Sequence, residues 1–192
     1  MYIKDWKKEV FTIPNLLSLF RLVLIPVYVH IYLNAKVEQD YLLAGIILAV
    51  SCLTDAVDGK LARHLNQISN LGKLLDPVAD KFTQLAITMC LSTRYPVLLK
   101  VLVLFLIKEF FQLFAMVMNL CKGKMLDGAL MAGKVCTTVL FTSLILMVLM
   151  PNLGVMWVDI IATVDCVFLA VAFLQYIRAY FGKHAKVQDI ET

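Results

Sequence analysis

Four aspartates and an arginine lie close together in residues 55–80, within a chain that is otherwise strongly apolar. If helices flank the segment, Asp55 and Asp58 share one helical face and Asp76 and Asp80 share another, because residues three or four apart are neighbours. Two such faces opposed would form a cage of carboxylates, the ligands that hard divalent cations prefer. A bound pair of ions would neutralise the charge that spreads over a diphosphate during its displacement. The pattern therefore predicts a site for Mg²⁺ or Mn²⁺.

The composition places this site in a membrane protein. The 192 residues are 61% hydrophobic with a mean hydropathy of +0.82, and several apolar runs are long enough to cross a bilayer. The five cysteines are widely spaced beside apolar segments, which predicts small buried side chains rather than disulfides or a metal site. The net charge of +4 comes without a basic stripe interleaved with aromatic residues, so nucleic-acid binding is not expected.

The hydropathy pattern predicts an all-α, polytopic membrane fold in a single domain over residues 1–192. Residues 1–12 alternate apolar and charged side chains with helical periodicity, which indicates a short amphipathic helix on the membrane surface. Six transmembrane helices are expected within residues 13–180, followed by a polar cytoplasmic tail at residues 181–192. The first span is too long for a cleaved signal peptide and carries Arg21. The spans are predicted at residues 13–33, 41–62, 74–93, 97–120, 129–150 and 155–180.

Basic residues set the expected orientation. Lysine and arginine concentrate at the span ends that share a side with the N-terminus, whereas Lys36, Arg94 and Lys100 flank the opposite ends. By the positive-inside rule, both termini are predicted to be cytoplasmic. The aspartates then lie at the cytoplasmic side of the cytoplasmic membrane, where substrates made in the cytosol can reach them.

The acidic stretch resembles the signature of the CDP-alcohol phosphotransferase family, which is DxxDGxxAR, eight residues, then GxxxDxxxD. A lone DxxD would be weak, because helices carry acidic pairs at that spacing by chance. Here every fixed position is present, namely Asp55, Asp58, Gly59, Ala62, Arg63, Gly72, Asp76 and Asp80. The resemblance implies that Asp55, Asp58 and Asp76 ligate two metal ions bound to the CDP diphosphate, while Asp80 takes the proton from the acceptor hydroxyl.

Spacing alone leaves two roles open for Asp80. It lies one helical turn beyond Asp76 and further from the connecting loop, where it could face an incoming acceptor. The same position suits a fourth metal ligand. We favour the role of base, because the reaction needs one within hydrogen-bonding reach of the hydroxyl.

The remaining signature residues are expected to bind the nucleotide and its diphosphate. Gly59 and Gly72 lack side chains on the acidic faces, which would let a nucleotide approach the helix backbone, although close helix packing is an equal alternative. Arg63 can present a planar fork to a phosphate oxygen, and its alternative role is an interfacial anchor. Asp55 and Ala62 complete this predicted group.

Further charged residues lie within or beside the apolar spans. Lys134 and Arg178 near the cytoplasmic face, with Lys108 deeper, predict a cationic pocket for a phosphate carried by the acceptor. Lys81, beside Asp80, would serve the same pocket or lower the pKa of that acid. Each of these cations also admits a simpler interpretation as a member of a structural ion pair.

A second polar row lies on the first span. Asn15, Ser18 and Arg21 follow one another at three-residue spacing and therefore share one side of a helix. They are predicted to tie this helix to its neighbours by hydrogen bonds, and the alternative is that they line the cleft.

Within the family, several segments resemble those of the phosphatidylglycerophosphate synthases. These segments are IPNLLSLFRLVLIP at 13–26, DPVADK at 76–81, Glu109 after a cation, and GKxxT at 133–137. This resemblance implies transfer of the phosphatidyl group of CDP-diacylglycerol to sn-glycerol 3-phosphate, with release of CMP, by a homodimer among membrane lipids. Such sequences commonly carry Arg-Glu where this chain has Lys108-Glu109, which lacks the planar fork of a bidentate phosphate clamp.

Other functions stay open at this point. A cardiolipin synthase that uses CDP-diacylglycerol and phosphatidylglycerol, or an enzyme with an inositol-phosphate or serine acceptor, would share the aspartate cage. A cation-coupled transporter is the alternative from another class, but no internal repeat is visible in the chain. A prenyl-diphosphate transferase also pairs magnesium with aspartates, although those proteins are usually longer and space their acids differently.

Overall fold

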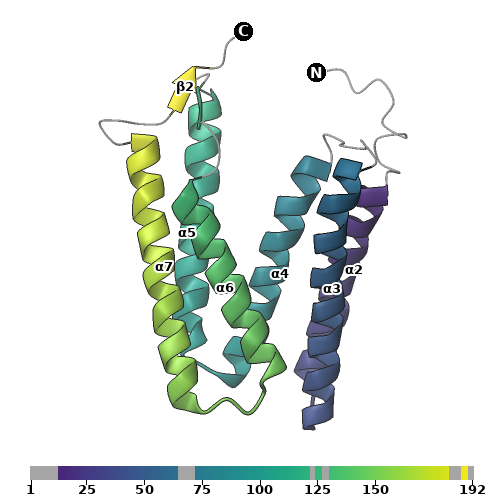
Figure 1. Ribbon diagram of the computed structural model, residues 1–192. Coiled ribbons are helices and arrows are strands. Elements are labelled where there is room, and N and C mark those ends of the chain that lie inside the picture. The colour runs from purple at the N-terminus through teal and green to yellow at the C-terminus, as the bar shows by residue number, and fades with distance from the viewer. Residues whose placement is uncertain (1–12, 65–71, 122–123, 127–129, 182–186, 190–192) are drawn as a thin grey trace. The chain divides into compact units, whose positions relative to one another are not determined.

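The computed structural model of the protein describes residues 13–64, 72–121, 124–126, 130–181 and 187–189 (Figure 1). They form six long helices, which are α2 (Ile13–Asn34), α3 (Glu38–His64), α4 (Gly72–Arg94), α5 (Leu98–Cys121), α6 (Met131–Leu149) and α7 (Val155–Phe181). Each of the six predicted spans coincides with one of these helices, so the helical assignment is confirmed. The interfacial helix predicted at residues 1–12 lies outside the described residues.

Three helices of the described chain are long and apolar enough to cross a membrane. These spans are Leu98–Asn119, Met131–Leu149 and Val155–Phe181, and α2 adds the shorter apolar stretch Ser18–Asn34. Large apolar side chains along them, such as those of Phe110 and Phe114, are exposed, as expected for helices surrounded by lipid. The protein is therefore an integral membrane protein. The signature acids of α3 and α4 set these two helices apart from ordinary apolar spans.

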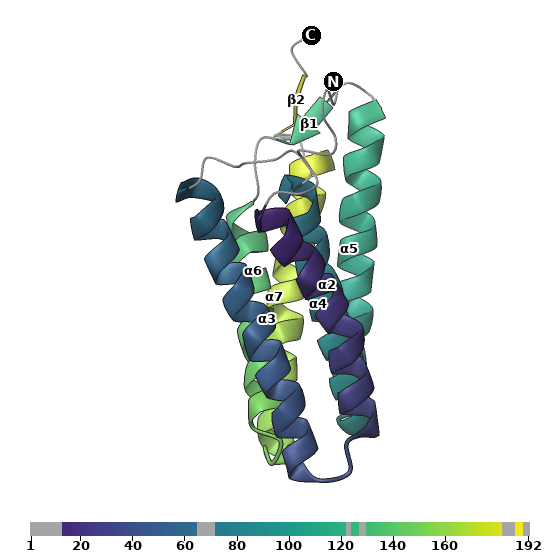
Figure 2. The ribbon, with the colours of Figure 1, turned by 90° about the vertical axis from the view of Figure 1, so that its right-hand side faces the viewer.

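The chain divides into two compact units, and the first contains residues 1–91 and 145–152. Its helices α2 and α3 form an antiparallel hairpin (Figure 2), in which Tyr32 and Tyr41 meet edge to face with ring centroids 5.2 Å apart. Residues of α2, α3 and α4 together line a cavity of only about 10 Å³. This volume is at the lower limit for one water molecule, so the three helices close tightly on one another.

The start of α3 is capped by its own first turn. Asp40 Oδ2 accepts hydrogen bonds from the backbone N–H groups of Lys36, at 2.8 Å, and Val37, at 3.2 Å. These backbone donors stabilise the carboxylate and hold the pKa of Asp40 below its usual value. The side chain of Asn152 donates a further hydrogen bond of 2.7 Å to Glu38 Oε1, which ties the end of the unit's second segment to the same turn.

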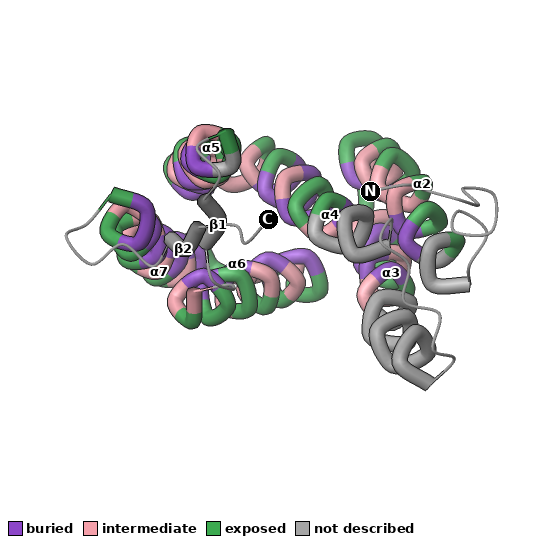
Figure 3. The backbone as a smooth tube through the Cα atoms, turned by 90° about the horizontal axis from the view of Figure 1, so that it is seen from above, coloured by how far each residue is buried: buried purple, intermediate pink, exposed green. Residues whose placement is uncertain are grey.

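The second compact unit contains residues 92–144 and 153–192, in which α5 packs against α7. Buried positions recur along α7 every three or four residues, from Val158 to Tyr180, so they mark the packed face of this helix (Figure 3). Phe111 and Phe173 meet edge to face with centroids 5.1 Å apart. Ser143 Oγ donates a 2.7 Å hydrogen bond to Asp165 Oδ2, which joins α6 to α7.

Two short strands accompany the helices of the all-α fold. Strand β1 (Lys124–Leu126) pairs in antiparallel fashion with β2 (Val187–Asp189), and Met125 lies opposite Gln188. Strand β2 therefore falls within the segment predicted as a polar tail. A three-residue strand is too short to show the alternation by which strands are predicted, and its partner lies far away in sequence.

Candidate functional site

The acidic signature lies at the end of α3 and the start of α4. All eight of its positions have a helical backbone, which confirms the predicted placement: Asp55, Asp58, Gly59, Ala62 and Arg63 belong to α3, and Gly72, Asp76 and Asp80 to α4. The signature acids of each helix are therefore neighbours along one side of it. Among the eight, the side chain of Asp80 is described, and the other positions lie outside the part of the chain whose side chains are described.

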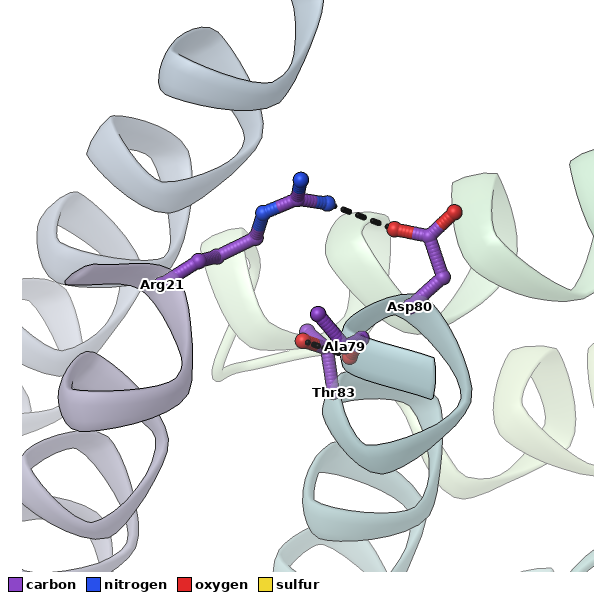
Figure 4. Close-up of polar contacts among 4 residues, drawn as sticks. All are labelled: Arg21, Ala79, Asp80 and Thr83. Carbon is purple, nitrogen blue, oxygen red and sulfur yellow. Dashed lines mark hydrogen bonds and ion pairs between the residues drawn. The ribbon is translucent and has the colours of Figure 1, made fainter. Parts of the chain in front are cut away.

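Asp80 forms an ion pair with Arg21 of α2. Arg21 Nη1 donates to Asp80 Oδ1 at 2.6 Å (Figure 4). The arginine side chain is 3% exposed and the aspartate side chain is 45% exposed. The cation is thus held inside the helix interface while the carboxylate remains accessible. The prediction that the polar row of the first span ties this helix to a neighbour is confirmed at Arg21.

The backbone beside Asp80 is fixed by buried neighbours. Ala79 is fully buried, and the buried Thr83 Oγ1 donates a 2.8 Å hydrogen bond to the Ala79 carbonyl oxygen (Figure 4). Ser18 lies one helical turn before Arg21 on α2 and is also fully buried. These residues mark the buried sides of α2 and α4, and Asp80 follows Ala79 along α4.

A second charged group lies within the other compact unit. Lys108 of α5 is 5% exposed, and its Nζ donates to Glu109 Oε1 at 2.5 Å. The same ammonium group lies 5.9 Å from the centroid of the Tyr176 ring of α7, within the range of a cation–π contact. The predicted alternative of a structural ion pair therefore holds at Lys108. Sequence reasoning missed Tyr176, because a tyrosine in an apolar span carries no signal beyond ordinary packing.

The cations predicted to form the acceptor pocket differ in how far they are buried. Lys108 is buried, whereas Lys134 at the start of α6, Arg178 near the end of α7 and Lys81 of α4 are exposed. Lys108 contacts Glu109 and Tyr176. A joint role in binding a phosphate stays a prediction.

The donor set of the acidic signature suits a hard divalent cation. Asp55 and Asp58 on α3, with Asp76 on α4, supply the carboxylate oxygens that Mg²⁺ and Mn²⁺ prefer. Among the side chains that the structure describes, no group of three or more His, Cys, Asp or Glu residues could hold a metal ion. None of the five cysteines forms a disulfide in the structure. Cys90 and Cys136 are buried, as predicted, whereas Cys52 and Cys166 are partly buried and Cys121 is exposed, which corrects the expectation of burial there.

Comparison with known proteins agrees with the acidic signature. A family model described as CDP-alcohol phosphatidyltransferase matches residues 11–173. The chain is 45% identical over 85 residues to a CDP-diacylglycerol–glycerol-3-phosphate 3-phosphatidyltransferase of Escherichia coli strain K12, covering 44% of this chain and 46% of that protein. It is 43% identical over 88 residues to a CMP-forming cardiolipin synthase of Streptomyces coelicolor, covering 45% of this chain and 41% of that protein. The matches thus span less than half the length of these curated relatives.

The contact between Gly133 and Tyr176 leads to a prediction about stability. A Cβ at Gly133 would overlap the Tyr176 hydroxyl, and this tyrosine is buried with little room to move. We expect Gly133→Ala to lower the free energy of unfolding by about 1–3 kcal/mol. Thermal unfolding of the purified protein in detergent measures the effect. Gly154→Ala is the matched control, because no atom lies within 4 Å of its added Cβ, and equal stability of both variants would contradict the packing described.

Proposed function

We propose that this chain, which belongs to the CDP-alcohol phosphatidyltransferase family, transfers the phosphatidyl group of CDP-diacylglycerol to the hydroxyl of sn-glycerol 3-phosphate. The products are phosphatidylglycerophosphate and CMP. The observation that carries this proposal is the complete acidic signature on the helical ends of α3 and α4 within one compact unit. The similarity to the named Escherichia coli enzyme supports the choice of acceptor.

In this proposal the first signature residues bind the donor. Asp55, Asp58 and Asp76 would hold divalent ions, which when bound neutralise negative charge on the CDP diphosphate. Arg63 would add a planar, bidentate donor to a phosphate oxygen. Gly59 and Gly72, together with Ala62, would leave room for the nucleotide to approach the backbone of the two helices.

Asp80 would act on the acceptor. Its carboxylate is accessible, so an acceptor hydroxyl can donate a hydrogen bond to it and then lose its proton to it. The hydroxyl oxygen forms a bond to the phosphorus that carries diacylglycerol. The bond from that phosphorus to the oxygen of CMP breaks, and CMP leaves with the electron pair.

The acceptor's own phosphate would be bound by cationic side chains. Lys134, Arg178 and Lys81 are exposed and positively charged, and Lys108 is a buried cation within a membrane span. A dianionic acceptor gains more from such groups than an uncharged alcohol does. Cardiolipin synthesis from phosphatidylglycerol is the second candidate, and the similarity to the named Streptomyces enzyme favours it over other acceptors.

The proposal includes the arrangement in the membrane. We propose one domain of six transmembrane helices, with both termini and the active site on the cytoplasmic side, and assembly as a homodimer. Three helices long and apolar enough to span, and the concentration of lysine and arginine on one side, support this arrangement.

An assay of acceptor choice tests the proposed reaction. Purified protein with CDP-diacylglycerol and Mg²⁺ is offered sn-glycerol 3-phosphate, phosphatidylglycerol, inositol 1-phosphate or serine in parallel, and CMP release is measured. We expect sn-glycerol 3-phosphate to support the fastest release and EDTA to abolish it. Faster release with phosphatidylglycerol would identify a cardiolipin synthase, and no release with any acceptor would overturn the proposed activity.

Substitution of the proposed metal ligands is a second test. Asp55→Asn, Asp58→Asn and Asp76→Asn are each expected to lower turnover by about a hundredfold or more, because each removes a charged ligand from a shared cluster. The Mg²⁺ concentration that gives half-maximal rate should rise in each of the three variants. Asp159→Asn, at an exposed aspartate of α7, serves as the control that keeps its activity. Wild-type rates in two of the three signature variants would end the assignment.

Lys134→Ala tests the proposed acceptor pocket. Loss of one charge-assisted hydrogen bond is expected to raise the KM for sn-glycerol 3-phosphate by about tenfold or more. The KM for CDP-diacylglycerol should change far less, because the lipid donor would be bound by the signature on α3 and α4. Lys100→Ala, which removes another exposed lysine, is the control for net charge. Equal changes in both KM values would refute the pocket.

A further inference from the structure

We infer that Arg21 of α2 is a positioning residue for Asp80: its guanidinium group holds the Asp80 carboxylate in a fixed direction, toward the acceptor. The inference rests on the proposed function and adds to the acidic signature a residue from a third helix. It is carried by the ion pair of 2.6 Å between Arg21 Nη1 and Asp80 Oδ1 (Figure 4).

The unequal burial of the pair indicates which partner positions the other. The Arg21 side chain is almost fully enclosed, and Ser18 on the same side of α2 is fully buried. A guanidinium group in such an interface cannot swing away without leaving an unpaired charge among apolar helices. The Asp80 side chain is nearly half exposed, so it alone has room for other conformations. Arg21 therefore restricts the carboxylate and not the reverse.

The backbone of Asp80 is equally restricted. Ala79, its neighbour on α4, is fully buried, and its carbonyl oxygen accepts the hydrogen bond of Thr83. With the preceding residue, Ala79, fully buried and Oδ1 held by Arg21, the carboxylate has a defined direction. Such preorganisation is what a general base needs, because a displacement of about 1 Å can lower a rate about a hundredfold.

Charge also distinguishes the two roles of Asp80. A guanidinium group already compensates this carboxylate, and a divalent cation on the same group would bring two positive charges close together. Asp55, Asp58 and Asp76 would then form the metal cluster, and Asp80 would belong to the acceptor side. The contact with α2 agrees with the division of roles that the family resemblance implies.

A double-mutant cycle in CMP release tests this role. Arg21→Met is expected to lower kcat about 10- to 100-fold in the wild-type background. The KM for CDP-diacylglycerol and the Mg²⁺ concentration for half-maximal rate should stay within about twofold. In the Asp80→Asn background, Arg21→Met should lower kcat further by less than about threefold, because Arg21 acts through Asp80. Residual rates are followed with radiolabelled CDP-diacylglycerol.

Two further variants separate positioning from general damage. Arg21→Lys keeps the charge but not the planar fork, so its kcat should lie between those of wild type and Arg21→Met. Because Arg21→Lys keeps a cation in the interface, it also completes the cycle if Arg21→Met fails to fold. Ser143→Ala, which removes the hydrogen bond between α6 and α7, controls for loss of a polar contact between helices and should keep its kcat.

The possible results are distinguishable. If Arg21→Met lowers kcat by the same factor in the wild-type and Asp80→Asn backgrounds, the positioning role is overturned. A shift in Mg²⁺ dependence as large as that of Asp76→Asn would instead place Asp80 among the metal ligands and also overturn the inference. Failure of the wild-type protein to release CMP with any acceptor would overturn the proposed function itself.

Discussion

A charge that lies between apolar helices has to be paired, because its desolvation is not offset by lipid or by aliphatic side chains. The described structure meets this requirement at Arg21 and Asp80 between α2 and α4, and at Lys108 and Glu109 on α5. The first pair joins two helices, whereas the second is contained within one. The buried charge of Arg21 on α2 therefore depends on Asp80 of α4 as its partner. The direction of the Asp80 carboxylate depends in turn on Arg21.

Small side chains and short hydrogen bonds complete the scaffold around these charges. Ala79 and Thr83 are buried on α4, and tyrosines of α2 and α3 contact each other in the hairpin that precedes it. In the other unit, the Tyr176 ring contacts Lys108 and packs over Gly133, which has no side chain to displace it. Large apolar side chains cover much of the exposed surface of these helices.

Membership of the family does not by itself decide the acceptor. The two named relatives carry the names of different reactions, one with glycerol 3-phosphate and one that forms cardiolipin. In this chain the cations outside the signature differ in burial, and the buried Lys108 contacts Glu109 and Tyr176.

The sequence by itself determined the helices and the site motif. Hydropathy and helical periodicity along the chain made the approximate extents of α2 to α7 predictable. The spacing of Asp55, Asp58, Asp76 and Asp80 likewise depends only on helix geometry. The partner of Asp80, the contact of Tyr176 and the pairing of β1 with β2 were decided by the tertiary structure. Arg21 and Asp80 are 59 residues apart, and their contact depends on how two helices rotate and pack, which no local pattern encodes.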